Sequence, residues 1–446
     1  MQKVMSAFEQ LGEFVAGYRP DERDRAAVRL HVVDTIGAWI AGAATAEGRA
    51  LAGFRSAAGD GLAGEIATHC ASTRLSEVDD IYLGAMITPG AIVVPAALAI
   101  AASRPQIAAD DLAAAIIGGY EGMIRLGAAI DGPSVLYRGI WPSYFAAPLG
   151  VAAAVARLLR LDGTRTANAL ATALIMAAPG TGHHGAPTTA RWLAVGQAAA
   201  RGLVAALSAQ AGFTSDVKIA EGEFLKGIYG IVPNAVVLGG GFGTPALHQV
   251  SFKPWCAARQ TMAATQALKD IIAEGVAPDG IVEIEATVLP PHLKMIGHGV
   301  TAGDRFSHLT SLPYQMAVAA LSPDAAYEIA GPAGEIAPAL LAFMARIKMR
   351  ADDSLLVGGY PNVWPAHVTV STRTGRYARH IDHVPGGPGR PLGEAELKEK
   401  FRRVVAAVLP SDQADALFAR GLTAIDQPSD VLREIVAATS VAAPRR

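Results

Sequence analysis

The chain has 446 residues, of which 51% are apolar and 17% are charged, and its formal net charge is −2. A chain of this length usually exceeds one hydrophobic core, and so apolar a composition argues against disorder. Apart from Arg445–Arg446 at the end, no basic run stands out, which argues against a nucleic-acid partner.

The cysteines and the longest apolar stretches bear on where the protein works. Cys70 and Cys256 lie far apart in the sequence, which has neither the cysteine pattern of a disulfide scaffold nor clustered zinc ligands. The apolar stretches at 91–102 and 146–156 are shorter than the roughly 20 residues of a membrane span. The first residues lack the apolar core of a signal peptide. We expect a soluble, cytoplasmic protein with no metal site and no membrane partner.

Helical periodicity dominates from residue 21 to about 249. Apolar residues recur one turn apart, and glycine, proline or aspartate separates the periodic segments. The segments predicted as helices are 25–43, 112–130, 144–161, 164–178 and 190–211.

The pattern changes after about residue 251. Residues 280–289 and 366–372 alternate apolar and polar side chains as strands do, and 377–384 is the expected hairpin partner of the second. Helical patterns return at 394–408 and 411–420. We therefore predict a mainly α protein with a large all-helical domain and a smaller α+β lid domain inserted before a C-terminal helical return. The predicted limits are 1–251 and 393–446 for the helical domain, and 252–392 for the lid domain.

Two polar pairs in the helical part are candidates for chemistry. Asp79 and Asp80 precede an apolar helix, where paired carboxylates can exchange protons or simply serve the helix start. His183 and His184 lie in a loop rich in glycine and proline. Adjacent histidines are poor paired metal ligands on a helix, but one of them could act as an acid, a base or an anion donor.

Further candidates lie at the start of the predicted lid domain. Lys253 is followed by a tryptophan, and an apolar wall would favour the neutral, basic form of the amine. Arg259 could hold a carboxylate with its planar fork. Tyr314 stands at a helix entry, where a hydroxyl can donate to a developing enolate. The alternatives are solvated cations and a packed aromatic ring.

These segments, in this order, resemble the MmgE/PrpD family, which includes 2-methylcitrate dehydratases, cis-aconitate decarboxylases and iminodisuccinate epimerase. The likeness extends over most of the chain. It rests on DTIGAWIAG (34–42), EVDD and TPGAIVVPAALAIA (77–101), VGQAAARGLVAALSAQAGFTS (195–215), FKPWCAARQT (252–261) and SLPYQMAVAAL (311–321).

The resemblance implies a helical domain with an α+β lid domain, a homodimer, and a site between the domains. It also implies an enzyme without a cofactor that removes a proton next to a carboxylate of a small polycarboxylate. Carried over residue by residue, Asp79 or Asp80 matches the acidic pair of the family. Lys253 matches its lysine at the lid entry, and Tyr314 matches its LPY tyrosine.

Three departures distinguish this chain from the dehydratase-like members of the family. Thr88 stands where those members have a histidine before Pro-Gly, and Trp141 replaces a second histidine before proline. Arg191 stands where they have a lysine. Loss of two histidines should harm dehydration and decarboxylation more than epimerisation, which needs a base on one face and a proton donor on the other.

The sequence therefore favours an iminodisuccinate-epimerase-like isomerase. The alternatives are a dehydratase or decarboxylase of a citrate-like or aconitate-like acid, and a non-catalytic polyacid-binding protein. The predicted catalytic residues are Lys253, Tyr144, Tyr314, His184 and Asp79, and the predicted substrate-binding residues are Asp80, Trp141, His183, Arg191 and Arg259.

Overall fold

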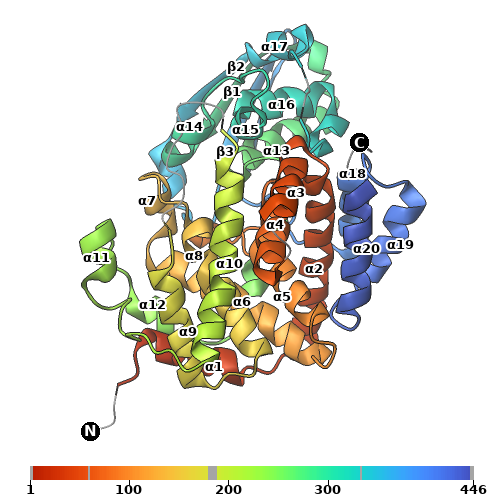
Figure 1. Ribbon diagram of the computed structural model, residues 1–446. Coiled ribbons are helices and arrows are strands. Elements are labelled where there is room, and N and C mark those ends of the chain that lie inside the picture. The colour runs from red at the N-terminus through yellow and green to blue at the C-terminus, as the bar shows by residue number, and fades with distance from the viewer. Residues whose placement is uncertain (1–3, 59–60, 179–187, 332–333, 442–446) are drawn as a thin grey trace. The chain divides into compact units, whose positions relative to one another are not determined.

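The computed structural model describes residues 4–58, 61–178, 188–331 and 334–441 (Figure 1). It is mainly helical with one small sheet, which confirms the predicted fold class. The chain divides into two compact units. The first unit consists of Met1–Val250 and Leu397–Arg446, and the second of Ser251–Glu396.

The first unit is built from helices throughout its described residues. Its helices are α1 (Ala7–Gly17), α2 (Glu22–Ala43), α3 (Ala46–Ala58), α4 (Leu62–Arg74), α5 (Gly90–Ala102), α6 (Ala109–Ala129), α7 (Gly132–Leu136), α8 (Pro142–Leu158), α9 (Gly163–Ile175), α10 (Ala190–Gln210), α11 (Glu223–Tyr229), α12 (Ala235–Gly239), α19 (Ser411–Gly421) and α20 (Pro428–Val441). Helix α18 (Glu394–Val405) carries the boundary between the units.

Small side chains allow the helices of the first unit to pack closely. Helix α10 packs on α4 and α8, and a Cβ on Gly196 would lie only 2.1 Å from the carbonyl oxygen of Ala67. This close approach is one reason for the abundance of alanine and glycine in the composition. The C-terminal helices α19 and α20, drawn in blue, return to pack on α2 (Figure 1).

Helix α10 is the one described helix that is long and apolar enough to cross a membrane. Within its most apolar window, 61% is buried inside the structure. Core helices of soluble proteins have this combination of length, composition and burial, and α10 also packs on α4, α8 and α9.

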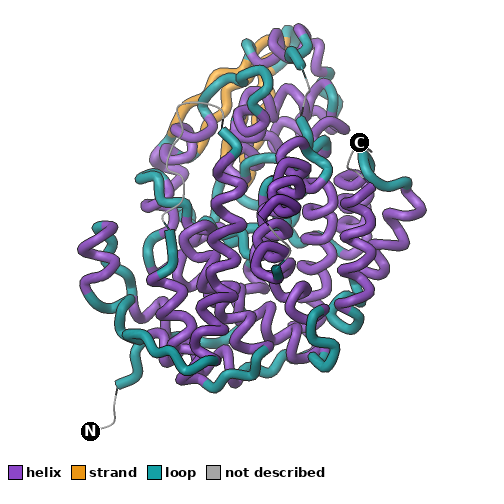
Figure 2. The backbone as a smooth tube through the Cα atoms, viewed as in Figure 1, coloured by secondary structure: helices purple, strands orange, loops and turns teal. Residues whose placement is uncertain are grey.

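The second unit contains the sheet (Figure 2). Its elements are α13 (Arg259–Ala273), β1 (Ile281–Val288), α14 (Pro290–Ile296), α15 (Arg305–Thr310), α16 (Leu312–Leu321), α17 (Pro338–Met344), β2 (Ile347–Ala351), β3 (Ala366–Thr372) and β4 (Arg376–Ile381). The strand order is β2-β1-β3-β4, with β1 and β2 parallel and the other two pairs antiparallel. Helix α13 packs on β3, β4 and α16, and the core of the unit lies among them.

The predicted strands β1, β3 and β4 are present, and β2 was not expected from the sequence. Strand β2 has five residues, and only its first, Ile347, is buried. Its sequence, IKMRA, alternates apolar and polar residues like the other strands, but the pattern extends over only five residues.

Candidate active site

Two groups of mostly buried residues, one in each unit, contain several of the predicted site residues. In the first unit they are Arg74, Asp79, Trp141, Tyr144 and Arg191, which we call the Tyr144 cluster. In the second unit, Ser251, Arg259, His292 and Gly387 lie near one another, and we call them the Arg259 cluster. Each is described by itself.

Asp79 is held by an arginine at the end of α4. Arg74 Nη1 lies 3.2 Å from Asp79 Oδ1 and 3.0 Å from Glu77 Oε1, and all three residues are buried. Burial lowers the pKa of Arg74, but Asp79 and Glu77 outweigh that effect and raise it. Glu77 adopts a φ of 57°, a left-handed conformation that costs free energy in a residue other than glycine. Contacts with Arg74 therefore fix a strained turn that presents Asp79.

Asp80 has a different environment. Its Oδ2 accepts hydrogen bonds from Tyr120 (2.7 Å) and His31 Nδ1 (2.8 Å), and its Oδ1 accepts from the backbone N–H of Gly90 (2.8 Å). A Cβ on Gly90 would lie 2.7 Å from Asp80 Oδ1, so glycine is needed there. Burial and the charge of Asp80 raise the pKa of Tyr120 well above its usual value. These contacts match the helix-start role left open by the sequence, because Gly90 begins α5.

A second buried ion pair supports this region from the C-terminal helices. Lys400 Nζ on α18 lies 2.5 Å from Asp34 Oδ1 on α2 and donates to the carbonyl oxygen of Val78 (3.1 Å). Burial raises the pKa of Asp34, and Lys400 opposes this rise. The turn that carries the acidic pair is therefore tied to helices from both ends of the chain.

Trp141, Tyr144 and Arg191 come together at the start of α8. The guanidinium carbon of Arg191 lies 4.2 Å from the centre of the Trp141 ring, and the Trp141 and Tyr144 rings are 5.8 Å apart. Tyr144 is 1% exposed, and its hydroxyl has no hydrogen-bond partner within the described part of the chain. An electrostatic interaction with Tyr144 makes a smaller contribution to the raised pKa of Arg74. A proton-bearing hydroxyl therefore lies buried beside a cation.

Thr88 belongs to the same neighbourhood. Its backbone N–H donates to Ser143 Oγ (2.9 Å), and the two hydroxyl oxygens are 3.0 Å apart. Thr88 and Trp141, which replace the two histidines of dehydratase-like members, thus lie beside and at the N-terminus of the same helix, α8. The predicted residues His183 and His184 lie outside the described residues.

In the second unit, Lys253 lies in the segment that enters α13. Lys253 is 1% exposed, and the N–H of the preceding Phe252 donates to the carbonyl oxygen of Gly386 (2.9 Å). The sequence suggested that Trp255 would form a wall for Lys253. In the structure Trp255 belongs to the hydrophobic core of the unit, and Lys269 Nζ lies 4.4 Å from the centre of its ring.

Arg259 is the first residue of α13, and its side chain is almost fully buried. Burial lowers the pKa of its guanidinium to about 10. Within the described residues, neither Nε nor Nη1 of Arg259 has a hydrogen-bond partner, and the same is true of Ser251 Oγ. A Cβ built on Gly387 would lie 3.4 Å from Ser251 Oγ and 4.0 Å from Arg259 Nη2, so the three residues are neighbours.

His292, on α14, is a third buried polar group of this cluster. Its ring packs edge-on against Trp364 and Tyr360, at centroid distances of 4.7 and 6.1 Å. Burial, with a smaller effect of the Arg259 charge, lowers the pKa of His292 to about 3. His292 Nε2 has no hydrogen-bond partner in the part of the chain that the structure describes. The ring is therefore neutral at physiological pH.

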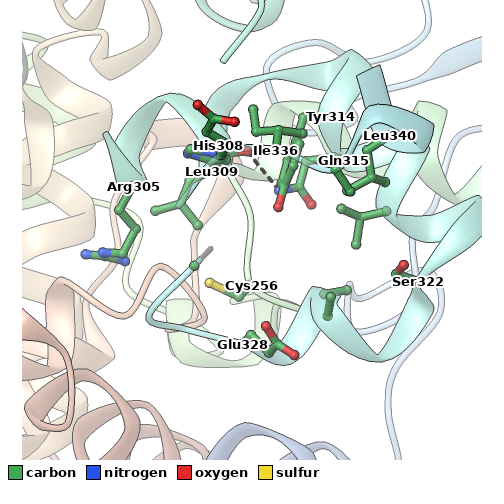
Figure 3. A pocket seen from close by; sticks show the side chains of 16 residues that line it. Cys256, Arg305, His308, Leu309, Tyr314, Gln315, Ser322, Glu328, Ile336 and Leu340 are labelled. Carbon is green, nitrogen blue, oxygen red and sulfur yellow. Dashed lines mark hydrogen bonds between the residues drawn. The ribbon is translucent and has the colours of Figure 1, made fainter. Parts of the chain in front are cut away.

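Tyr314 lies in a separate cavity of the second unit, of about 230 Å³. Figure 3 shows His308, Tyr314 and Gln315 on one side of the opening and Cys256 and Glu328 on the other. The Tyr314 and His308 rings meet edge to face at 4.9 Å. Burial and, to a smaller degree, Glu328 raise the pKa of Tyr314. Neither Lys253 nor Arg259 is among the residues that line this cavity.

The structure thus groups some predicted residues and adds others. Trp141, Tyr144 and Arg191 are brought together, while Asp80 and Tyr314 lie in surroundings of their own. Sequence reasoning missed Arg74, Ser251, His292 and Gly387. The acidic residues that follow Arg74 within five positions could have indicated its ion pairs. His292 and Gly387 are distant from Arg259 in the sequence, so no local pattern indicated that they lie near it. Over the described ranges, no group of three His, Cys, Asp or Glu side chains could hold a metal ion.

Comparison with known protein families gives two matches in chain order. The MmgE/PrpD N-terminal domain matches residues 9–234, and the MmgE/PrpD C-terminal domain matches residues 255–423. No individual curated protein matches the chain. The two ranges cover most of the 446 residues and include the Tyr144 cluster and most of the Arg259 cluster. The chain therefore belongs to the MmgE/PrpD family, whose members are enzymes that process small acids.

Proposed function

We propose that the protein is a cofactor-independent epimerase of a small amino or imino polycarboxylate similar to iminodisuccinate. It removes a proton from the carbon next to a carboxylate and returns one to the opposite face. Cys70 and Cys256 are not joined by a disulfide, which suits a reducing, cytoplasmic location. A homodimer, as in the family, is part of the same proposal.

The start of α8 carries this proposal. Where dehydratase-like members have two histidines, this chain has Thr88, bonded to Ser143, and Trp141, stacked on Arg191. An alcohol pair and an indole do not titrate near neutral pH, so neither supplies the acid that a departing hydroxyl requires. Tyr144 is the proton-bearing side chain that remains at this helix start. Epimerisation requires one proton to be returned to the α-carbon, and the Tyr144 hydroxyl carries one.

We assign the base to Lys253 and the proton donor to Tyr144. The α-proton passes to the Lys253 amine, the electron pair moves into the carboxylate to give an aci-carboxylate, and the Tyr144 proton is delivered to the other face. The tyrosinate that forms is stabilised by the nearby Arg74 cation, which Asp79 and Glu77 hold in place.

Cations provide the remaining part of the mechanism. Arg259 and Arg191 bind substrate carboxylates, and Arg191 stabilises the negative charge that develops on the reacting one. His183 and His184 remain candidates for the same task. We assign Asp80 a positioning role at the start of α5, because three hydrogen bonds already occupy its two oxygens. Tyr314 is the weaker candidate for proton donor because it lines a separate cavity.

Incubation of the enzyme with a stereopure iminodisuccinate in deuterated water tests the proposed reaction. We expect inversion at one α-carbon, with one deuterium incorporated there. Release of water or carbon dioxide from citrate-like or aconitate-like acids, without inversion of the imino acid, would assign the protein to the lyases instead. Binding of these acids without any conversion would identify a retired enzyme that only binds polyacids.

A further inference from the structure

We propose that the Arg259 cluster is a carboxylate subsite that holds one non-reacting carboxylate of the substrate. Arg259 supplies the positive charge, and Ser251 and His292 supply two further hydrogen-bond donors. This inference rests on the proposed function for the identity of the whole substrate, but the subsite itself is argued from the structure.

The first argument is the state of the Arg259 side chain. A buried guanidinium is normally paired with a carboxylate, because removing an isolated charge from water costs several kcal/mol. Arg259 is 4% exposed, yet its Nε and Nη1 have no hydrogen-bond partner within the described residues. A ligand carboxylate would provide the missing negative charge and accept from both N–H groups.

The second argument is the surroundings of that guanidinium. Ser251 is fully buried, and its hydroxyl also has no partner within the described ranges. A Cβ built on Gly387 would lie 3.4 Å from Ser251 Oγ, 3.5 Å from the carbonyl oxygen of Val384 and 4.0 Å from Arg259 Nη2, so the glycine leaves open a space that a side chain would fill. The loop is fixed there by the hydrogen bond from Phe252 to Gly386, whose φ is 96°. The result is a small cradle with donors on two sides.

The third argument concerns His292 and the charge that the cradle accepts. The aromatic rings of Trp364 and Tyr360 pack against the His292 ring, which is 2% exposed. In the tautomer that carries hydrogen on Nε2, this neutral ring donates without adding charge. One guanidinium and two neutral donors match a single negative charge. The ligand group is therefore a carboxylate rather than a phosphate dianion.

Gly387→Ala is the sharpest variant for testing the subsite. The added methyl would make ordinary contacts at 3.4 Å or more, so the fold should survive, but it would occupy the space of the carboxylate. Gly393→Ala is the matched control, because its nearest neighbour would be the Glu396 side chain at 3.7 Å. Circular dichroism and thermal melting of both variants verify folding.

Succinate, which has no imino group, is the probe, and calorimetry in a carboxylate-free buffer measures its binding to the full-length protein. We expect Gly387→Ala to weaken succinate binding at least tenfold and Gly393→Ala to leave it unchanged. Equal binding to wild type and Gly387→Ala would overturn the proposal. So would competition by chloride at the succinate concentration, because the site would then hold any small anion.

A measurement on the unmodified protein gives an independent test. Succinate should shift the His292 ring signals in NMR and raise the pKa of His292, while His69, buried in the first unit against Trp39, serves as the internal reference. An unshifted His292 signal at saturating succinate would contradict the proposal. Succinate binding without epimerisation would reject the proposed function alone. If the wild-type protein is an epimerase but the Gly387→Ala variant binds succinate normally, the subsite is rejected and the proposed function is not.

Discussion

The two units differ in how their buried cations are paired with carboxylates. In the first unit, Arg74 contacts two carboxylates, and Lys400 pairs with Asp34. In the second unit, Arg259 is equally buried and has no carboxylate partner within the described part of the chain. Pairing inside the protein fixes geometry before substrate arrives, whereas an unpaired buried cation lowers stability until a ligand supplies its counter-charge.

This difference suggests a division of labour. The ion pairs of the first unit hold the turn around Asp79 and fix the Arg74 cation, which interacts with Tyr144, the proton donor of the proposed reaction. In the proposed subsite, the buried charge of Arg259 lowers the stability of the ligand-free protein and is available to bind a carboxylate. Functional sites commonly retain such locally unfavourable arrangements, and the rest of the fold compensates for them.

The largest effect is expected for Lys253→Ala, which removes the proposed base. Turnover should fall by about 10³-fold or more, since a positioned general base contributes about 10²–10⁴. Lys269→Ala is the control, because Lys269 contacts the Trp255 ring in the same unit but has no proposed role. Steady-state kinetics with matched melting curves distinguish the two variants. Near-normal turnover of Lys253→Ala would remove it as the base.

A stability change of about 3–5 kcal/mol is expected for Lys400→Met, because it leaves Asp34 buried without its cation. Urea unfolding at neutral pH measures this loss. The double variant Asp34→Leu/Lys400→Met should recover much of it, since no buried charge then remains. A loss below about 1 kcal/mol in the single variant would mean that the pair does not support the fold.

The pH dependence of stability should report His292. Its pKa is about 3 in the folded protein and 6.5 for the free side chain, so the unfolded state binds more protons between these values. Stability is therefore complete above about pH 6.5 and falls as the solution becomes more acidic. Between pH 7.5 and 5 the loss from this group is about 2 kcal/mol. His292→Gln should remove that part of the slope in urea titrations, and an unchanged slope would contradict the assignment.

Arg259→Met should behave oppositely to Lys400→Met. Burial lowers the pKa of Arg259 to about 10, so its positive charge destabilises the folded state at neutral pH. Removing it should increase the free energy of unfolding by about 1 kcal/mol or more without ligand, while substrate binding is lost. Urea unfolding with and without succinate measures both effects. Destabilisation like that of Lys400→Met would show that Arg259 is paired within the protein.

The elements with a strong local pattern could be predicted from the sequence. Helices α2, α6 and α10 and strands β1 and β3 all follow from apolar spacing, which records the face that each element buries. Strand β2 was missed although its sequence alternates, because an alternation over only five residues with one buried side chain is a weak signal. Its partner is β1, some sixty residues earlier, and only the fold joins them.

The sequence indicated which residues could belong to the site, but not which of them lie close together in the folded protein. Lys253 and Arg259 were found because a cation next to an apolar sequence suggests chemistry. His292 and Gly387 carry no local signal, and they reach Arg259 only through α14 and the turn that joins Gly386 to Phe252. Asp80 is the opposite case. Its carboxylate suggested a catalytic role from the sequence, but in the structure its contacts are those of a residue that stabilises a helix start.

The most direct test of proton transfer between two faces is the Tyr144→Phe variant in deuterated water, with Tyr229→Phe as the control. Lys253 alone can still remove and return a proton on its own face. We therefore expect inversion to fall by about 10²-fold or more, while solvent deuterium still enters the epimer whose hydrogen faces Lys253, without inversion. Equal loss of exchange and inversion, or full retention of both, would contradict the assignment of Tyr144 as the second proton-transfer group.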